Sequence, residues 1–290
     1  MIREYLFPNS IEEAIGLLEK NQGCARLISG GTDLILDLAK ERVDTEILVD
    51  VTRIRGFHEV ALREGWVEIA AGATMAEIAA NELVNAHAPA LALAAAAVGS
   101  SQIRNSATLA GNIVRAQPAA DTAVMLAALG AWISVVGADG SRDIPVQESY
   151  LGIGQSAVDP TKELVAKIRF PKPEAHQGTA YVRLAQRKAL ALPMLNVGAM
   201  LSFSSGCIEW ARIVMGPVGA KPTSAAQAER YLAGKEPSGE VFQAAAALAA
   251  CDADPRSSYI RGSREYRLAV LPSLVAKALH AAHQIQEVEA

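Results

Sequence analysis

The sequence predicts an α+β fold in which two or three lobes share a cleft. The chain has 290 residues, which is longer than one ordinary domain. Of these residues, 51% are hydrophobic and 20% are charged, so the chain carries enough apolar material for packed cores. Segments with strand-like alternation and segments with helical spacing follow one another along the chain. The later strands are joined by a short turn, which favours an antiparallel sheet in the last region.

The opening region predicts a small βαβ-like unit, which we assign to a first lobe over residues 1–55. Ser10-Ile11-Glu12-Glu13 fits a capping box, and the apolar residues that follow at helical spacing predict a helix from Ile11 to Lys20. The other predicted elements are, in chain order, a strand at Arg26–Ser29, a turn at Gly30–Asp33, a helical turn at Leu34–Leu38 and a strand at Glu46–Val51.

The second region, residues 56–175, mixes strands with short helices. Thr74-Met75-Ala76-Glu77 is a second capping box and predicts the start of a helix. Asp121 stands at a position typical of a helix N-cap, before a helix that runs to Leu129. The other predicted elements are a strand at Trp66–Ile69, a buried alanine-rich helix at Pro89–Val98, a strand at Trp132–Val136, a hairpin turn at Asp139-Gly140 and a strand at Glu163–Phe170.

The third region, residues 176–290, predicts an antiparallel sheet flanked by helices. Strands are expected at Tyr181–Ala185, Val197–Phe203 and Cys207–Met215, with a turn at 204–206 between the last two. Helices are expected at Ser224–Leu232, Gly239–Ala250 and Arg264–Gln286.

Two glycine-containing segments share one chemical logic. The first runs from Ile28 through Ser29, Gly30, Gly31 and Thr32 to Asp33, and the second is Thr108-Leu109-Ala110-Gly111-Asn112. Glycine lets a backbone approach a ligand closely, and successive free N–H groups in a turn form a concave anion site. Hydroxyl groups in both segments add donors that suit phosphate oxygens. Together the two segments would clasp a diphosphate from two sides.

The competing interpretation is that each segment merely connects a strand to a helix. Neither segment matches G-x-G-x-x-G or a Walker loop, so neither the Rossmann nor the P-loop mechanism applies. On chemistry alone, the two segments therefore indicate either a dinucleotide cleft or two ordinary connectors.

Composition excludes several other classes of protein. A net charge of −4 gives no general attraction to nucleic acid or to acidic membranes. The richest apolar stretch, Pro89 to Val98, is far shorter than the roughly 20 residues of a membrane span. The first residues lack a secretory pattern, so a cytoplasmic protein is expected. Cys24, Cys207 and Cys251 are too few and too scattered for a four-ligand metal site, and we interpret them as buried free thiols.

Four stretches of the chain form a recognisable series: SGGTDL at 29–34, AAGATMAEI at 70–78, QIRNSATLAGNIVRAQPAAD at 102–121 and RGSREYR at 261–267. Their order and spacing resemble those of the FAD-binding medium subunit of the xanthine dehydrogenase and carbon monoxide dehydrogenase family, the molybdenum hydroxylases. The resemblance covers nearly the whole chain, and several ordered matches are more specific than any single turn.

The resemblance implies a fold and a cofactor. The first two lobes would form an FAD-binding domain of the vanillyl-alcohol-oxidase type, and an antiparallel sheet with helices would follow as a C-terminal domain. Residues 28–33 would hold the pyrophosphate through backbone N–H groups and hydroxyls. Thr108, Ala110, Gly111 and Asn112 would form the second wall. Ala110 departs from the family's usual Gly-Gly, although its backbone N–H remains available.

The resemblance also implies roles for four residues outside the glycine segments. Asp121 would accept hydrogen bonds from flavin-nucleotide hydroxyls, alongside or instead of capping a helix. Leu164 and Val165 would pack on the isoalloxazine ring, with ordinary strand core as the alternative. Arg183 would stabilise the anionic reduced flavin, and its alternative is a solvated charge at a strand edge.

For function, the resemblance implies an oxidoreductase subunit that binds FAD and has no catalytic acid, base or nucleophile. The expected partners are a small subunit with two [2Fe-2S] clusters and a large subunit with the molybdopterin cofactor, in a heterotrimer or its dimer. Electrons would pass from the clusters through FAD to NAD, a quinone or another acceptor. Two alternatives remain open, namely a stand-alone FAD-dependent reductase on the same fold and an interaction subunit that has lost its flavin.

Overall fold

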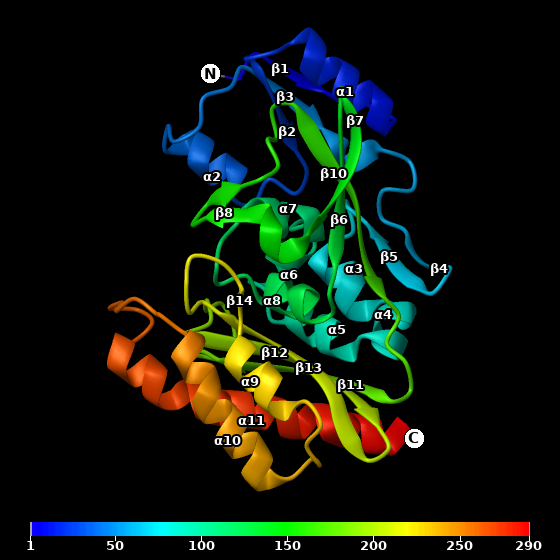
Figure 1. Cartoon of the computed structure of the whole chain (residues 1–290). Helices are drawn as coiled ribbons and strands as arrows, with labels where there is room; N and C mark the ends of the chain where they lie inside the picture. The colour runs from blue at the N-terminus through cyan, green and yellow to red at the C-terminus, as the bar shows by residue number, and fades with distance from the viewer. Residues whose placement is uncertain (1, 290) are drawn as a thin grey trace.

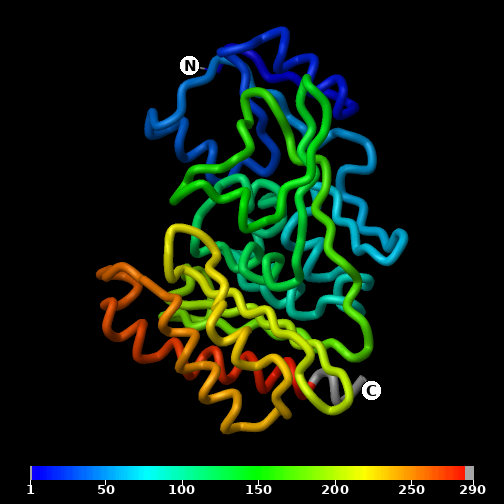
Figure 2. The backbone as a smooth tube through the Cα atoms, viewed as in Figure 1, coloured from blue at the N-terminus to red at the C-terminus, as the bar shows by residue number. Residues whose placement is uncertain are grey.

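The computed structural model describes residues 2–289, with side chains up to residue 284. Three sheets of three to five strands follow one another along the molecule, and β8 and β9 form a separate two-stranded sheet. The chain thus runs from a small sheet at one end to a helical layer at the other (Figures 1 and 2). The predicted α+β class is confirmed, because each sheet has its own helices rather than one continuous parallel sheet.

The first sheet is parallel and has the strand order β1-β3-β2. It confirms the predicted βαβ unit, since a helix and a loop connect β2 to β3 on the same sheet. Helix α1 begins where predicted, because Ser10 Oγ accepts a hydrogen bond from the Glu13 backbone N at 3.1 Å. The elements are β1 (Glu4–Leu6), α1 (Ile11–Lys20), β2 (Ala25–Ile28), α2 (Leu34–Ala39), β3 (Ile47–Asp50) and the short 3-10 helix η1 (Val51–Arg53).

The second sheet is antiparallel, with the order β4-β5-β10-β6-β7 and β10 at its centre. Six short helices lie between β5 and β6 in the chain. Its strands are β4 (Val60–Arg63), β5 (Trp66–Ala70), β6 (Trp132–Gly137), β7 (Gly140–Pro145) and β10 (Glu163–Pro171), with η2 (Val146–Ser149), β8 (Tyr150–Gly152) and β9 (Gln155–Ser156) between β7 and β10. Its helices are α3 (Met75–Ala80), α4 (Glu82–His87), α5 (Pro89–Ala96), α6 (Ser101–Arg104), α7 (Leu109–Val114) and α8 (Asp121–Ala128).

The third sheet is antiparallel in the order β11-β12-β13-β14, as the sequence predicted for its first three strands. Helices α9, α10 and α11 form a layer beside it at the end of the molecule (Figure 1). Its elements are β11 (Gln177–Leu184), β12 (Leu195–Ser204), β13 (Cys207–Gly216), β14 (Thr223–Ser224), α9 (Ala226–Leu232), α10 (Gly239–Ala249), η3 (Ala250–Asp252) and α11 (Arg264–Glu289).

Helix α8 is the boundary between the second and third sheets. All eight of its residues are buried, so both sides of the helix are covered by other parts of the chain. Gly198 in β12 lets α8 pack closely on the third sheet, because a Cβ at this position would lie 3.0 Å from the Val124 carbonyl oxygen. The main core includes Met200 and Val214 from the third sheet, and the C-terminal sheet and helices have a second core of their own. The proposed boundaries after residues 55 and 175 stay predictions.

Three further observations concern the described residues. No helix among them is long and apolar enough to cross a membrane. No group of three His, Cys, Asp or Glu side chains within residues 2–289 is arranged to hold a metal ion. The prediction that the cysteines are buried is wrong, since Cys24 and Cys251 are exposed and Cys207 is half-buried, although all three are free thiols.

Candidate functional site

A cleft of about 610 Å³ brings the two glycine segments together. Its walls come from three stretches that are far apart in the chain. They are the end of β2 with the start of α2, the start of α7 with the residues before it, and the loop around β9. Of the predicted site residues, Ile28, Ser29, Gly30, Gly31, Thr32, Asp33, Thr108, Gly111 and Asn112 line this cleft.

The first glycine segment packs against the chain that precedes the second. A Cβ on Gly30 would lie only 1.8 Å from the Ser106 carbonyl oxygen, so only glycine fits there. Gly31 has a φ of +64°, in the left-handed region that favours glycine. The neighbouring Ser29 Oγ is buried and has no hydrogen-bond partner among the described residues. A hydroxyl of this kind, on the wall of a cleft, is available to a ligand.

The sequence suggested that the second glycine segment is an irregular turn, and this is wrong. The segment forms the N-terminus of helix α7. Thr108 is the N-cap, and its Oγ1 accepts a hydrogen bond from the Gly111 backbone N at 3.2 Å. Gly111 therefore has helical geometry, and a Cβ there would meet only Thr108 Oγ1, at 2.9 Å. Asn112 Oδ1 accepts from the Thr122 hydroxyl at 2.7 Å. Ala110 is buried and lies outside the cleft lining.

Two arginines of the cleft were missed by the sequence analysis. Arg26 and Arg115 both line it, and each has a buried Nε without a hydrogen-bond partner among the described residues. Burial lowers the pKa of the Arg26 guanidinium, while Asp159 and Asp37 oppose this shift. The sequence offered one signal for Arg115, because it follows Gly111 by four residues and so shares its helix face.

Asp121 occupies a different position from the predicted helix N-cap. It is the first residue of α8, the N-cap position belongs to Ala120, and no side chain caps the helix. Its Oδ1 instead accepts hydrogen bonds from the Tyr181 hydroxyl, from Arg183 Nε at 3.0 Å and from Asn196 Nδ2 at 3.3 Å. The N-cap interpretation is therefore wrong, and Asp121 connects α8 to the third sheet.

Arg183 is not a solvated charge at a strand edge. Its side chain is only 12% exposed, and its guanidinium also donates to the Ala191 carbonyl oxygen. Burial raises the pKa of the Asp121 carboxyl, and the hydrogen bonds from Tyr181 and Arg183 oppose that rise. Burial and the Asp121 carboxylate raise the pKa of the Tyr181 hydroxyl well above its ordinary value, so it stays a donor.

The four residues predicted to contact the flavin from outside the glycine segments do not line the cleft. Leu164 and Val165 lie on β10 and are buried in the main core. Asp121 and Arg183 lie in the cluster between α8 and the third sheet. Contact of these four residues with a flavin stays a prediction.

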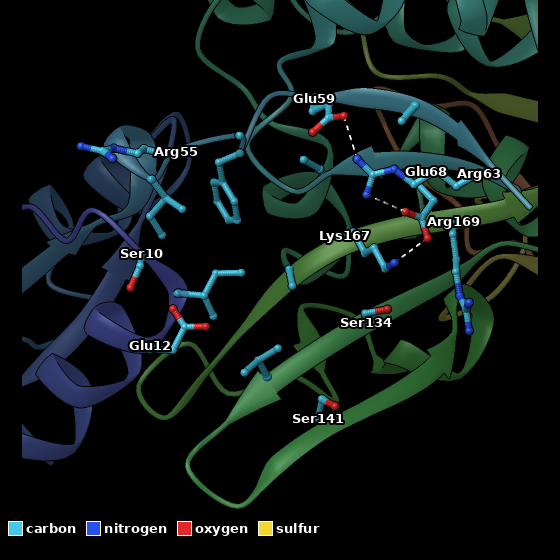
Figure 3. A pocket seen from close by; sticks show the side chains of 18 of the residues that line it. Ser10, Glu12, Arg55, Glu59, Arg63, Glu68, Ser134, Ser141, Lys167 and Arg169 are labelled. Carbon is cyan, nitrogen blue, oxygen red and sulfur yellow. Dashed lines mark hydrogen bonds and ion pairs between the residues drawn. The ribbon is translucent and has the colours of Figure 1, made fainter.

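A larger hollow, of about 1170 Å³, lies elsewhere, over one face of the five-stranded sheet (Figure 3). Alternation along β10 places Lys167 and Arg169 on this face and buries Ile168 and Phe170 on the other. The charged side chains over the strands pair with one another, namely Lys167 with Glu68, Arg63 with Glu59 and Arg169 with Asp143. These charged groups of the groove are therefore engaged with one another.

Comparison with known proteins agrees with the geometry of the cleft. Residues 1–173 match the family described as the FAD binding domain in molybdopterin dehydrogenase. Residues 180–282 match the CO dehydrogenase flavoprotein C-terminal domain. The chain therefore belongs to the family of flavoprotein subunits of molybdopterin dehydrogenases, as the four sequence stretches predicted. It is the FAD-binding subunit of a multi-subunit, molybdenum-dependent oxidoreductase.

Relatives of this chain cover almost its whole length. It is 28% identical to the nicotinate dehydrogenase FAD-subunit of Eubacterium barkeri over 83% of each chain. It is 27% identical to the xanthine dehydrogenase FAD-binding subunit of Escherichia coli, over 93% of this chain and 92% of that one. In a solved carbon monoxide dehydrogenase from Hydrogenophaga pseudoflava, the matching chain is 28% identical and superposes with a TM-score of 0.92 over 98% of both chains.

The residues of the cleft fit the nucleotide half of FAD. Gly30 leaves no side chain between the two segments, and Ser29 offers a buried hydroxyl without a partner in the described chain. Arg26 and Arg115 offer cationic donors to a diphosphate, beside the carboxylates of Asp33, Asp37 and Asp159.

Proposed function

We propose that this chain is the electron-transfer subunit of a cytoplasmic molybdenum hydroxylase. Its partners are a small subunit with two [2Fe-2S] clusters and a large subunit with the molybdopterin cofactor, in a heterotrimer or its dimer. When bound, FAD takes up electrons that come from the iron–sulfur clusters and gives them to NAD, a quinone or another acceptor. No side chain of this chain acts as a catalytic acid, base or nucleophile.

The observation that carries this proposal is the meeting of both glycine segments at one cleft, where the buried Ser29 hydroxyl lacks a partner among the described residues. Residues 28–33 hold the diphosphate through backbone N–H groups and hydroxyls. Gly111 and Asn112 form the opposite wall, on the exposed side of α7. The tight packing of Gly30 on Ser106 fixes the spacing between the two walls.

The isoalloxazine ring is expected between this cleft and the third sheet, packed on Leu164 and Val165 and near Arg183. Asp121 is expected to accept hydrogen bonds from hydroxyls of the flavin nucleotide. The burial of Arg183 supports its role, because its side chain is 12% exposed and is held by Asp121. A charge at a buried, fixed position is screened little by water, so it would favour the negative charge that develops on reduction.

The proposal predicts that the isolated chain binds about one FAD per chain and prefers FAD to FMN. The reason is that the cleft grips a diphosphate, which FMN lacks. Flavin absorbance after denaturation measures the content, and competition between FAD and FMN measures the preference. Equal retention of both flavins would sink the proposed diphosphate site.

The same preparation separates this function from a stand-alone flavin reductase. Expressed with its neighbouring genes, the chain should co-purify with subunits that carry iron and molybdenum. Expressed alone, it should contain neither metal, because its three cysteines are widely separated. A chain that reduces substrate with a nicotinamide while alone, and that captures no metal-containing partner, would replace the proposed function with the reductase.

A further inference from the structure

One arginine joins the two glycine segments across the cleft. The Arg115 backbone N donates to the Gly111 carbonyl oxygen at 3.0 Å, so Arg115 lies one turn beyond Gly111 at the end of α7. Its Nη1 donates to Asp37 Oδ2 of α2 at 2.5 Å, and its Nε lies 3.5 Å from Asp33 Oδ1. Arg115 therefore follows the second segment in the chain and is bonded to it through its backbone, and its side chain reaches the first segment at Asp33.

The ion pair with Asp37 does not occupy all of the N–H donors of Arg115. Asp37 has a second cation, since Arg42 Nη1 lies 3.7 Å from its Oδ1. A guanidinium has five N–H donors in a planar fork. The Nε of Arg115 is buried beside Asp33, whereas Nη2 makes no hydrogen bond to a described residue and the side chain as a whole is 36% exposed. Arg115 thus has unused donors on the wall of a cleft that is open to solvent.

The charges that line the cleft indicate why a diphosphate would need these N–H donors. The carboxylates of Asp33, Asp37 and Asp159 line it together with Arg26 and Arg115. A diphosphate placed among three carboxylates would be repelled unless a cation lay close to it. Arg115 is the cation that already touches both glycine segments, and a planar fork suits two phosphate oxygens at once.

We propose that Arg115 binds the diphosphate of FAD directly and that its ion pair with Asp37 holds the guanidinium in position. This inference rests on the proposed function and adds to it a binding residue that lies outside both glycine segments. Arg115 donates to the diphosphate through its unused N–H groups and keeps its bond to Asp37.

The test compares three ligands on purified, flavin-free protein: FAD, ADP and riboflavin. FAD and ADP contain a diphosphate, and riboflavin contains no phosphate. In Arg115→Gln, the dissociation constants of FAD and ADP should rise about 10- to 100-fold, as expected for the loss of a hydrogen bond to a charged group. The dissociation constant of riboflavin should stay within about twofold. Arg115→Lys keeps the charge without the fork and should recover part of the loss.

Arg42→Gln is the matched control, because Arg42 contacts the same carboxylate and lies outside the cleft lining. It should bind all three ligands as the wild type does. Arg115→Gln with wild-type affinity for FAD and ADP would overturn the inference, and so would an equal loss of affinity for riboflavin, which would mark a structural role. A wild-type protein that binds ADP through Arg115 but does not bind FAD would overturn the proposed function and, with it, the assignment of Arg115 to the diphosphate of FAD. FAD binding that is unchanged in Arg115→Gln would overturn the inference alone.

Discussion

Two polar clusters of this chain differ in where their hydrogen bonds go. Around Asp121, the groups from α8 and the third sheet bond to one another, because Tyr181, Arg183 and Asn196 all donate to one carboxylate oxygen, although Asn196 Oδ1 is itself buried without a partner among the described residues. In the cleft between the glycine segments, Ser29 Oγ and Arg115 Nε are buried, and neither has a hydrogen-bond partner among the described residues.

A buried donor without a partner costs about 1–3 kcal/mol, so a fold keeps several of them together only where an acceptor comes from outside. The cluster around Asp121 therefore stabilises the fold, in addition to the flavin contacts proposed for Asp121 and Arg183, whereas the cleft keeps donors for a ligand. Substitutions around Asp121 should change the stability of the flavin-free protein, and substitutions in the cleft should mainly change flavin binding.

The largest effect is expected for Asp121→Ala. It would leave Arg183 and the Tyr181 hydroxyl without their buried acceptor and should lower the free energy of unfolding by about 3–5 kcal/mol. Denaturant unfolding of the flavin-free protein measures this change. Asp121→Asn keeps the shape and one acceptor oxygen, so it should cost less. A loss below about 1 kcal/mol in Asp121→Ala would show that the cluster contributes little to stability.

Gly30→Ala should affect both stability and binding. The new Cβ would lie 1.8 Å from the Ser106 carbonyl oxygen and would push the two cleft walls apart. We expect a loss of about 1–3 kcal/mol from overpacking, together with loss of FAD from the purified protein. The control is Gly16→Ala in α1, where no atom lies within 4 Å of the new Cβ. That exchange should raise stability by about 0.5–1 kcal/mol and leave the FAD content unchanged.

Ser29→Ala should give the smallest change in stability, while it should still weaken FAD binding. The removed hydroxyl has no partner in the described chain, so the flavin-free protein should keep its stability or gain up to about 1 kcal/mol. The affinity for FAD should fall about fivefold to tenfold, which corresponds to one hydrogen bond. Thermal unfolding without flavin and a binding titration decide the outcome. A less stable flavin-free variant with unchanged FAD affinity would reverse the assignment of this hydroxyl.

Local patterns predicted where several elements lie. The capping box at 10–13 placed α1 correctly, and the strand-like composition at 163–170, 197–203 and 207–215 placed β10, β12 and β13, although β10 pairs with strands far away in the chain. Helix α7 was missed because its six residues include glycine and asparagine, which favour turns. It is helical because Leu109 and Ile113 are fully buried in the main core, which is a tertiary effect.

The site residues that the sequence misassigned depend on contacts across the chain. Asp121 looks like an N-cap locally, but its partners lie 60 to 75 residues further along. Arg115 pairs with Asp37 across 78 residues, and no short motif contains both. The glycine segments were recognisable because each is a short run of neighbouring residues. The charged residues around them come together only when the lobes pack.

The order of the chain has a consequence for biosynthesis. All lining residues of the cleft lie between residues 26 and 160, and the five-stranded sheet behind it is complete when β10 ends at Pro171. Domains generally fold as units, N-terminal first, while a chain is being synthesised. The residues of the proposed nucleotide site are thus synthesised before those of the four-stranded sheet. The flavin can therefore bind to them while the rest of the chain is still being made.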